Sequence, residues 1–113
     1  MMTSHVTTHV LDTGTGRPAR GVTALLSLKS ADGWEAIADG TTDVDGRVRD
    51  LGPDRLEPGT YRISFGTGEY FSSTGTETFF PEVTLTFTVS SPTEHYHVPL
   101  LLSPFAYSTY RGS

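Results

Sequence analysis

The sequence predicts an all-β protein, an antiparallel β-sandwich, and three observations lead to this fold class. Residues 83–89 alternate strictly between apolar side chains and threonine, which is the two-residue period of a half-buried strand. Seven or eight short segments of this kind follow one another at spacings of roughly 8–12 residues, with turn signals between them. The composition agrees, because 12 Gly, 7 Pro and only 19% charged residues favour turns over long helices.

Strands separated by clear turns are expected in the first third of the chain. The segment 6–11 is rich in Val and Thr and ends at the turn "DTGTGRPARG", where glycine and proline prevent a regular ladder. Residues 22–28 and the segment "WEAIADGTT" flank the turn "ADG", which predicts a hairpin. In the second strand of this hairpin we expect Trp34, Ala36 and Ala38 to lie on one side.

The middle of the chain combines tight turns with one further strand and one helical turn. In "DVDGR", residues 43–47, Gly46 can take a positive φ without steric cost, and Arg47 follows it directly. The segment "LEPGTYRISF" predicts a Pro-Gly turn and then a strand with alternating apolar residues. Residues 69–74 can form one helical turn, and Gly75 argues against a longer helix.

The last two strands are expected over residues 95–102 and 105–110, separated by "SP". We expect the side chains of His95 and His97 to point to opposite faces, so that only one of them enters a given site. Pro99 lacks an N–H group, which indicates a sheet edge or a defect in strand pairing, where a side chain can be presented to a cleft.

Charge and composition argue against several classes of protein. The 113 residues fit a single domain, 1–113, and the absence of cysteine excludes disulfides and thiolate zinc sites. The net charge is −5 and the eight Lys and Arg are scattered, which argues against a nucleic-acid partner. The first residues do not resemble a signal peptide, and no run of about 18 apolar residues predicts a membrane span. We therefore expect a cytoplasmic protein with neither nucleic acid nor membrane as a partner.

Catalytic motifs that can be recognised from spacing alone are missing. The sequence has no HExxH or CxxC pattern, so we predict no metal site and no cofactor, and it has no GxSxG elbow to present a serine nucleophile. Taken alone, each of the four histidines is interpreted as a surface or partly buried residue with one hydrogen bond. Arg47 alone is interpreted as a solvated turn residue.

Five segments together carry a resemblance to a known family. They are "TTHVLDTGTGRPARG", "DVDGR", "PGTYRISFGTGEYF", "FFPEVTLTF" and "HYHVPLLLSPFAYSTYRGS". They resemble the transthyretin-like family over nearly the whole chain, and the terminal "YRGS" resembles its enzyme branch rather than the hormone carriers, whose tail differs. The resemblance implies a transthyretin-like sandwich of two four-stranded sheets with one short helix. It also implies a homotetramer, a dimer of dimers, with active sites in the channel between the dimers.

The activity that the resemblance implies is a step of urate catabolism. Enzymes of this branch hydrolyse a lactam C–N bond of 5-hydroxyisourate to give 2-oxo-4-hydroxy-4-carboxy-5-ureidoimidazoline, on the way to allantoin. The resemblance implies catalytic roles for His9, Arg47, His97 and Ser113. It implies substrate binding by His9, Arg47, Tyr110, Arg111 and Gly112.

These residue types fit the chemistry of lactam hydrolysis. A neutral histidine can take a proton from water, and we expect either His9 or His97 to be this base, which the sequence does not decide. The planar guanidinium of Arg47 suits a carbonyl-rich substrate and a developing oxyanion. The hydroxyl and carboxylate of Ser113 can orient a histidine, while His5 and His95 keep the ordinary interpretation.

Two other classes of protein compete with this hypothesis. The same fold can carry a hydrophobic ligand without catalysis, but a purely apolar channel does not need two histidines and an arginine. A generic immunoglobulin-like adhesion module is compatible with a cysteine-free composition, but it leaves the unusual tail unexplained.

Overall fold

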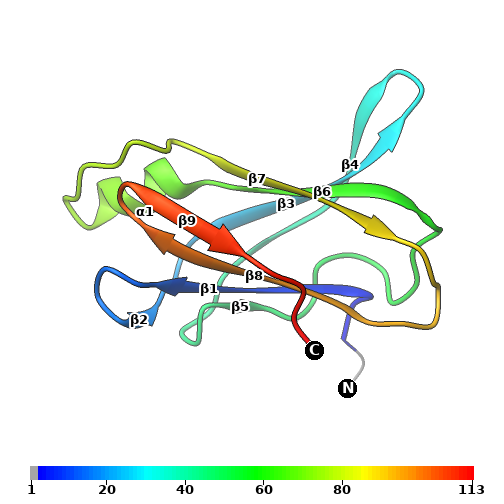
Figure 1. Cartoon of the computed structure of the whole chain (residues 1–113), viewed down its shortest axis with the longest axis horizontal. Coiled ribbons are helices and arrows are strands. Elements are labelled where there is room, and N and C mark those ends of the chain that lie inside the picture. The colour runs from blue at the N-terminus through cyan, green and yellow to red at the C-terminus, as the bar shows by residue number, and fades with distance from the viewer. Residues whose placement is uncertain (1–2) are drawn as a thin grey trace.

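Two β-sheets packed face to face make up the computed structural model, which describes residues 3–113 (Figure 1). The first sheet contains β1 (Val6–Asp12), β2 (Arg17–Pro18), β5 (Arg47–Val48), β8 (Tyr96–Ser103) and β9 (Ala106–Thr109). The second sheet contains β3 (Thr23–Ser30), β4 (Gly33–Thr41), β6 (Gly59–Phe65) and β7 (Val83–Val89). The predicted fold class, an all-β sandwich with one short helix, is confirmed.

The helix α1 (Thr67–Ser73) connects β6 to β7 and begins two residues before the predicted helical turn. It buries Thr67 and Phe71 against the sandwich, and the Thr67 hydroxyl donates a hydrogen bond to the carbonyl of Phe80 at 2.7 Å. Across residues 3–113, no helix has the length and apolar character needed to cross a lipid bilayer.

The first sheet differs from the predicted pairing in two respects. It has five strands, because the two-residue strands β2 and β5 both pair with β1, at different positions along it. In addition, β1 and β8 run parallel, whereas the other pairs in both sheets are antiparallel. A parallel pair needs a long connection, and most of the chain lies between these two strands.

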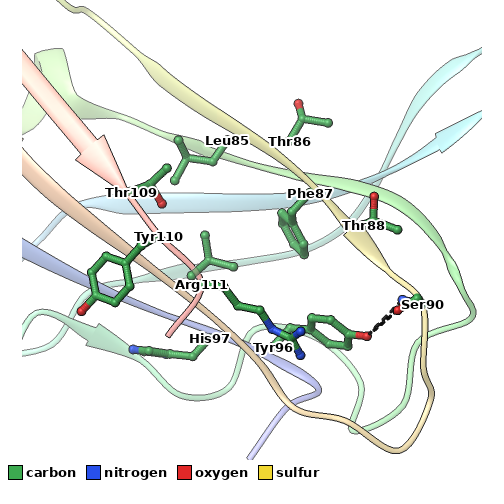
Figure 2. A pocket seen from close by; sticks show the side chains of 11 residues that line it. Leu85, Thr86, Phe87, Thr88, Ser90, Tyr96, His97, Thr109, Tyr110 and Arg111 are labelled. Atoms are coloured by element: carbon green, nitrogen blue, oxygen red, sulfur yellow. Dashed lines mark hydrogen bonds between the residues drawn. The ribbon is translucent and has the colours of Figure 1, made fainter. Parts of the chain in front are cut away.

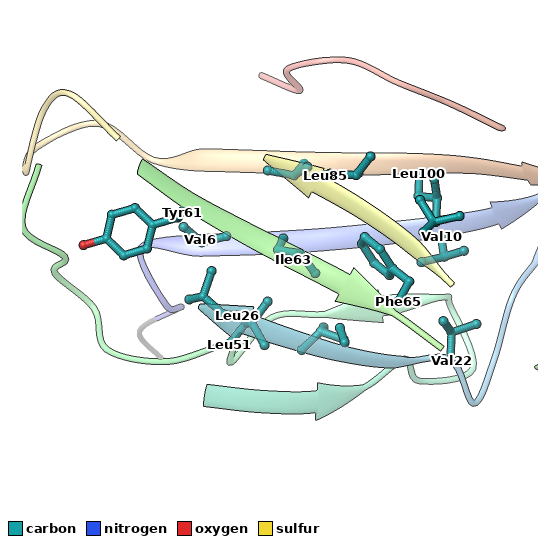
Figure 3. Close-up of a cluster of buried hydrophobic side chains, with 14 of the residues drawn as sticks. Val6, Val10, Val22, Leu26, Leu51, Tyr61, Ile63, Phe65, Leu85 and Leu100 are labelled. Carbon is teal, nitrogen blue, oxygen red and sulfur yellow. The ribbon is translucent and has the colours of Figure 1, made fainter. Parts of the chain in front are cut away.

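The core fills the space between the two sheets (Figure 3). Alternate residues of the strands point inward, as the two-residue period predicts, and each apolar side chain buried in this way contributes about 1.5–3 kcal/mol. Figure 3 shows Val6, Val10 and Leu100 from the first sheet and Leu26, Ile63, Phe65 and Leu85 from the second. With one face of each strand committed to the core, the opposite face is available for a site.

The β3–β4 hairpin contains a bulge that the sequence did not predict. Its register shifts between Leu26 and Ser27, so Ala38 lies opposite Leu26 whereas Ala36 lies opposite Ser27. Because successive residues of a strand face opposite sides, Ala38 shares the inner face with Leu26, and Ala36 and Trp34 lie on the other face. The expectation that Trp34, Ala36 and Ala38 share one side is therefore wrong.

Candidate active site

The outer face of the first sheet brings together three of the predicted site residues. In the parallel β1–β8 pair, Thr7 lies opposite His97 and His9 lies opposite Pro99. In the antiparallel β1–β5 pair, His9 lies opposite Arg47. Residues opposite each other on neighbouring strands share a face of the sheet. His9, Arg47 and His97 therefore lie on one face, although they come from three distant parts of the sequence.

The turn before β5 fixes the position of Arg47. The carboxylate of Asp43 accepts hydrogen bonds from the N–H groups of Asp45 at 2.9 Å and Arg47 at 3.0 Å. The bond from Arg47 is the main reason why the pKa of Asp43 lies below its ordinary value. Gly46 has the predicted positive φ of 75°, and its carbonyl accepts a bond from Val10 at 2.7 Å. A Cβ atom at Gly46 would clash with the carbonyl oxygen of Val10, so the turn requires glycine here.

A cavity of about 220 Å³ opens on this face. Its lining residues come from β1, from β5 and β8 with the residue next to each, and from both ends of the described chain, and they are Thr3, Thr7, Thr8, Arg47, Arg49, His95, His97 and Ser113. Arg49 lies 3.8 Å from the carboxylate of Asp43, whereas within residues 3–113 the guanidinium of Arg47 has no ion-pair partner. The half-buried Arg47 therefore offers free donors to an electron-rich ligand. His9 lies on the same face but does not line this cavity.

The surroundings of His97 disfavour its protonated form. It is half-buried, and its Nδ1 lies 2.8 Å from the hydroxyl oxygen of Thr7. Burial lowers the pKa of His97 below its ordinary value, and the charges of Arg47, His9 and His95 lower it further. An unprotonated ring nitrogen next to an unpaired guanidinium can accept a proton from a polarised water molecule.

His95 lies on the same face as His97, and the expectation that their side chains point to opposite faces is wrong. Its Nε2 lies 2.9 Å from the same Thr7 hydroxyl oxygen that contacts His97. Side chains in a strand alternate with a period of two residues, so residues two apart share a face. The interpretation of the sequence missed Thr7 and His95, although this alternation was the signal that could have found them.

The chain end is tied to His97 through Gly112. The N–H of Gly112 donates to the carbonyl of His97 at 2.8 Å. A Cβ atom at Gly112 would lie 2.5 Å from Cδ2 of the His97 ring, closer than real Cβ atoms approach. Glycine at this position thus lets the tail pass against the ring and brings Ser113 to the cavity.

Pro99 marks the pairing defect that the sequence predicted, but not a sheet edge. The strand β8 has β1 on one side and β9 on the other. The ladder to β9 ends at Leu100, is absent at Pro99, and resumes in the same register at the bridge between His97 and Gly112. This gap lies immediately beside His97.

Arg111 is directed away from the cavity that contains Arg47. Its guanidinium lies 4.5 Å from the centre of the Tyr96 ring and 3.2 Å from the carboxylate of Glu94. Figure 2 shows this second cavity, of about 350 Å³, with the rings of Tyr96 and His97 on different sides of Arg111. Tyr110 also lines it, with 59% of its surface exposed. Of the predicted site residues, the structure brings Arg47, His97 and Ser113 together in the first cavity, with Gly112 and His9 adjacent. Tyr110 and Arg111 lie in the second cavity, which His97 also lines.

Comparison with known proteins shows which family this chain is similar to. Residues 6–112 match the HIUase/Transthyretin family. The chain is 52% identical to the 5-hydroxyisourate hydrolase of Salmonella dublin over 106 residues, which is 93% of this chain and 78% of that protein. The structure is similar to that of Klebsiella pneumoniae 5-hydroxyisourate hydrolase, with a TM-score of 0.85 and 36% identity, covering 96% of this chain and 98% of that one.

A solved transthyretin from Sparus aurata is equally similar in fold. Its TM-score is 0.89 at 34% identity, and the match covers 95% of each chain. The sandwich is therefore shared by a protein named 5-hydroxyisourate hydrolase and a protein named transthyretin, and the fold does not separate the two. A distinction between the two therefore depends on the side chains on the outer face of the first sheet.

Proposed function

The chain belongs to the HIUase/Transthyretin family, and we propose that it hydrolyses 5-hydroxyisourate. One observation carries the proposal: the half-buried His97, the last residue Ser113, and Arg47, which has no ion-pair partner in the described part of the chain, line one small cavity on the outer face of the first sheet. In this reaction water adds to a lactam carbonyl and the C–N bond breaks, which gives 2-oxo-4-hydroxy-4-carboxy-5-ureidoimidazoline in urate catabolism. No cofactor takes part in the proposed reaction.

We assign the general base to His97 rather than His9. His97 lines the cavity and has a lowered pKa, which keeps it neutral and able to accept a proton near pH 7. With Nδ1 bonded to Thr7, its Nε2 is the nitrogen available to water. A base positioned in this way contributes about 10²–10⁴ in rate. We propose that His9, on the neighbouring strand, forms a hydrogen bond with the substrate.

Arg47 is the group proposed to stabilise negative charge. Its guanidinium carries a permanent charge and a planar set of donors, which match a carbonyl oxygen that becomes an oxyanion. Removal of a donor with this role typically costs about 10²–10³ in kcat. The hydroxyl and carboxylate of Ser113 are proposed to orient His97 or the attacking water, since Ser113 lines the same cavity.

The remaining tail residues are proposed to bind substrate, each in a different way. Gly112 permits the close approach of the tail to His97, and the exposed ring of Tyr110 is free to cover a ligand. Arg111 has to leave Glu94 and Tyr96 before it can contact a substrate in the Arg47 cavity.

We propose that the chain acts as a homotetramer, a dimer of dimers. The strands β7 and β9 are edges of their sheets, and unpaired edges favour association. The outer face of the first sheet also carries the half-buried Leu11 and Leu101 next to the polar site. Pairing of two such faces would enclose the cavity between subunits, which analytical ultracentrifugation can test by the mass of the assembly.

The direct test of the function is a coupled ultraviolet assay. Urate oxidase generates 5-hydroxyisourate, and the decay of its absorbance is followed with and without the protein. We expect a faster decay with the wild-type protein and a loss of about 10²–10³ in kcat/KM for Arg47→Lys, because lysine lacks the planar donors. Arg17→Lys on β2 is the control for loss of a guanidinium elsewhere on the surface. A decay that the wild-type protein does not accelerate contradicts the proposal and favours a carrier.

A further inference from the structure

A single hydroxyl group connects two histidines at the edge of the proposed active site. The Oγ1 atom of Thr7 lies 2.9 Å from Nε2 of His95 and 2.8 Å from Nδ1 of His97. Thr7 is only 6% exposed, His97 is half-buried, and His95 is exposed to solvent. The three side chains therefore form a hydrogen-bonded path from His97 to the exposed ring of His95, which lines the same cavity.

The chemistry of the hydroxyl constrains the two rings. A threonine hydroxyl has one proton to donate and two lone pairs that accept. It can donate to His95 Nε2 while it accepts from His97 Nδ1–H, or it can bond the rings in the opposite sense. It cannot donate to both rings at once, so the two contacting nitrogens are not both unprotonated acceptors. In the first arrangement Nε2 of His97 carries a free lone pair, which is the form that a general base needs.

We propose that Thr7 and His95 act as a proton relay behind His97, an inference that rests on the proposed hydrolase function. When Nε2 of His97 takes a proton from water, the Nδ1–H bond of His97 breaks and its proton passes to the Thr7 oxygen. The original hydroxyl proton of Thr7 then bonds to Nε2 of His95. In total, one O–H bond of water and the Nδ1–H bond of His97 break, N–H bonds form on Nε2 of His97 and on Nε2 of His95, and Thr7 exchanges one O–H bond for another. The hydroxide adds to the lactam carbonyl carbon, and the positive charge lies on His95.

The surrounding charges favour this transfer. The charged and titratable groups near the relay are Arg47 of β5, Arg49 just after β5, His9 of β1, Glu94, Arg111 and the carboxylate of Ser113. A positive charge on His97 is half-buried and close to Arg47, and the same burial and charge lower the pKa of His97. On His95 the charge lies on a ring that is more exposed than that of His97, one residue from Glu94 in the chain. The relay therefore moves the charge from an unfavourable place to a favourable one.

The relay also prepares the second half of the reaction. After the transfer, His97 is neutral and carries a proton on Nε2, the nitrogen that does not contact Thr7. That proton can pass to the leaving nitrogen of the lactam, while His95 returns its proton through Thr7 to Nδ1 of His97. One ring nitrogen thus serves first as base and then as acid, and His97 need not hold a positive charge between the steps.

The first test compares Thr7→Val with Thr7→Ser. Valine has the shape of threonine without its hydroxyl, so it breaks the path, whereas serine keeps the path. We expect Thr7→Val to lower kcat at least about tenfold with KM nearly unchanged, because the relay supplies part of the rate gained from a positioned base. We expect Thr7→Ser to keep most of the wild-type kcat. Equal kcat in the wild type and Thr7→Val overturns the relay.

The second test removes the terminal proton acceptor. His95→Gln keeps an amide that can bond to Thr7 but cannot take a proton. We expect a loss of kcat similar to that of Thr7→Val, and partial recovery when free imidazole is added, after subtraction of the uncatalysed decay. A His95→Gln variant with the wild-type kcat overturns the relay.

The third test does not depend on activity. Nitrogen-15 spectra of the histidine rings report which nitrogen carries the proton in the free protein. We expect His97 to be protonated on Nδ1 in the wild type and to shift toward the Nε2–H tautomer in Thr7→Val. Identical His97 spectra in the two proteins overturn the relay. If the spectra differ but the wild-type protein does not accelerate 5-hydroxyisourate decay, the proposed function fails while the control of the tautomer by Thr7 stands.

Discussion

Two histidines at the same end of the first sheet are held in different ways. His5, which is 4% exposed, lies just before β1, and its Nδ1 accepts a hydrogen bond from the N–H of Leu56 at 2.8 Å. Its Nε2–H donates to the carbonyl of Glu94 at 2.6 Å. His97 on β8 has Nδ1 bonded to the hydroxyl of Thr7, and its Nε2 has no hydrogen-bond partner among residues 3–113. One histidine is bonded at both nitrogens to backbone groups, and the other is bonded at one nitrogen to a hydroxyl.

The difference teaches how a fold separates structural from reactive histidines. A backbone N–H can only donate and a backbone carbonyl can only accept, so the partners of His5 permit one neutral tautomer. A hydroxyl can both donate and accept, so the partner of His97 permits a change of tautomer. We infer that His5 stabilises the fold by connecting three segments of the chain, whereas His97 is available for proton transfer.

The largest expected effect is that substitution of His97 removes activity, whereas substitution of His5 reduces stability. His97→Gln should lower kcat/KM by about 10²–10⁴, because it removes the proposed base, with little change in Tm. His5→Ala should instead lower the free energy of unfolding by about 1–3 kcal/mol, because it leaves the buried N–H of Leu56 without its hydrogen-bond partner. The ultraviolet assay and thermal denaturation measure the two effects. Loss of activity per folded molecule in His5→Ala would contradict the separation.

A smaller effect is expected from Gly112, which supports the reactive histidine sterically. Gly112→Ala places a methyl group 2.5 Å from Cδ2 of the His97 ring, so the ring or the tail must move. A displacement of this size should lower kcat/KM by about 10–100-fold. In the control Gly59→Ala, the new Cβ meets no atom closer than 3.5 Å. If both variants keep full activity, the contact between the tail and His97 is not needed for the proposed reaction.

Local pattern was sufficient for most of the fold and insufficient for its long-range pairing. The alternation in β7 and the turn at Gly46 depend on neighbouring residues, and both were predicted correctly. The parallel pairing of β1 with β8 joins the two ends of the chain, and no local period encodes it. The bulge near Leu26 was missed for a related reason, since one additional residue reverses the facing of a strand without a clear signal.

The site was accessible to sequence analysis only through the resemblance and the alternation rule. The resemblance pointed to His9, Arg47 and His97, which the two pairings of β1 bring to one face. Thr7 belongs to no short motif and becomes visible only through the parallel register that sets it opposite His97. His95 could have been found from the sequence, because residues two apart in a strand share a face. The prediction instead placed His95 and His97 on opposite faces.

The turn that carries Arg47 offers a third, intermediate effect. Asp43→Ala removes the carboxylate that holds the N–H groups of Asp45 and Arg47, so Arg47 should lose its fixed position beside His9. We expect kcat/KM to fall about tenfold, as for a misplaced substrate-binding group. The control is Asp45→Ala, since only the backbone N–H of Asp45 takes part in the turn. Equal effects of the two substitutions would contradict the positioning role of Asp43.

The smallest expected effect is on the pKa of His97, which burial and the positive charge of Arg47 lower. Burial is the main cause of the lowered pKa of His97, and Arg47 is the next. Arg47→Met removes a positive charge that disfavours the imidazolium, so the pKa of His97 should rise while staying below that of an exposed histidine. Arg49→Met should leave it unchanged, since Arg49 is not among the causes. Ring-proton chemical shifts measure both values without any need for activity.

The same pKa shift predicts a pH dependence of stability. The unfolded chain binds a proton at His97 at higher pH than the folded protein does, so between the two pKa values the unfolded state holds more protons. The contribution of His97 to stability is therefore complete above the ordinary histidine pKa and is lost as the pH falls through the lowered one. Arg47→Met brings the folded pKa of His97 closer to the unfolded one, so it should reduce the loss of Tm on acidification. An unchanged acid profile of Tm, together with an unchanged pKa of His97, would show that Arg47 does not act on this ring.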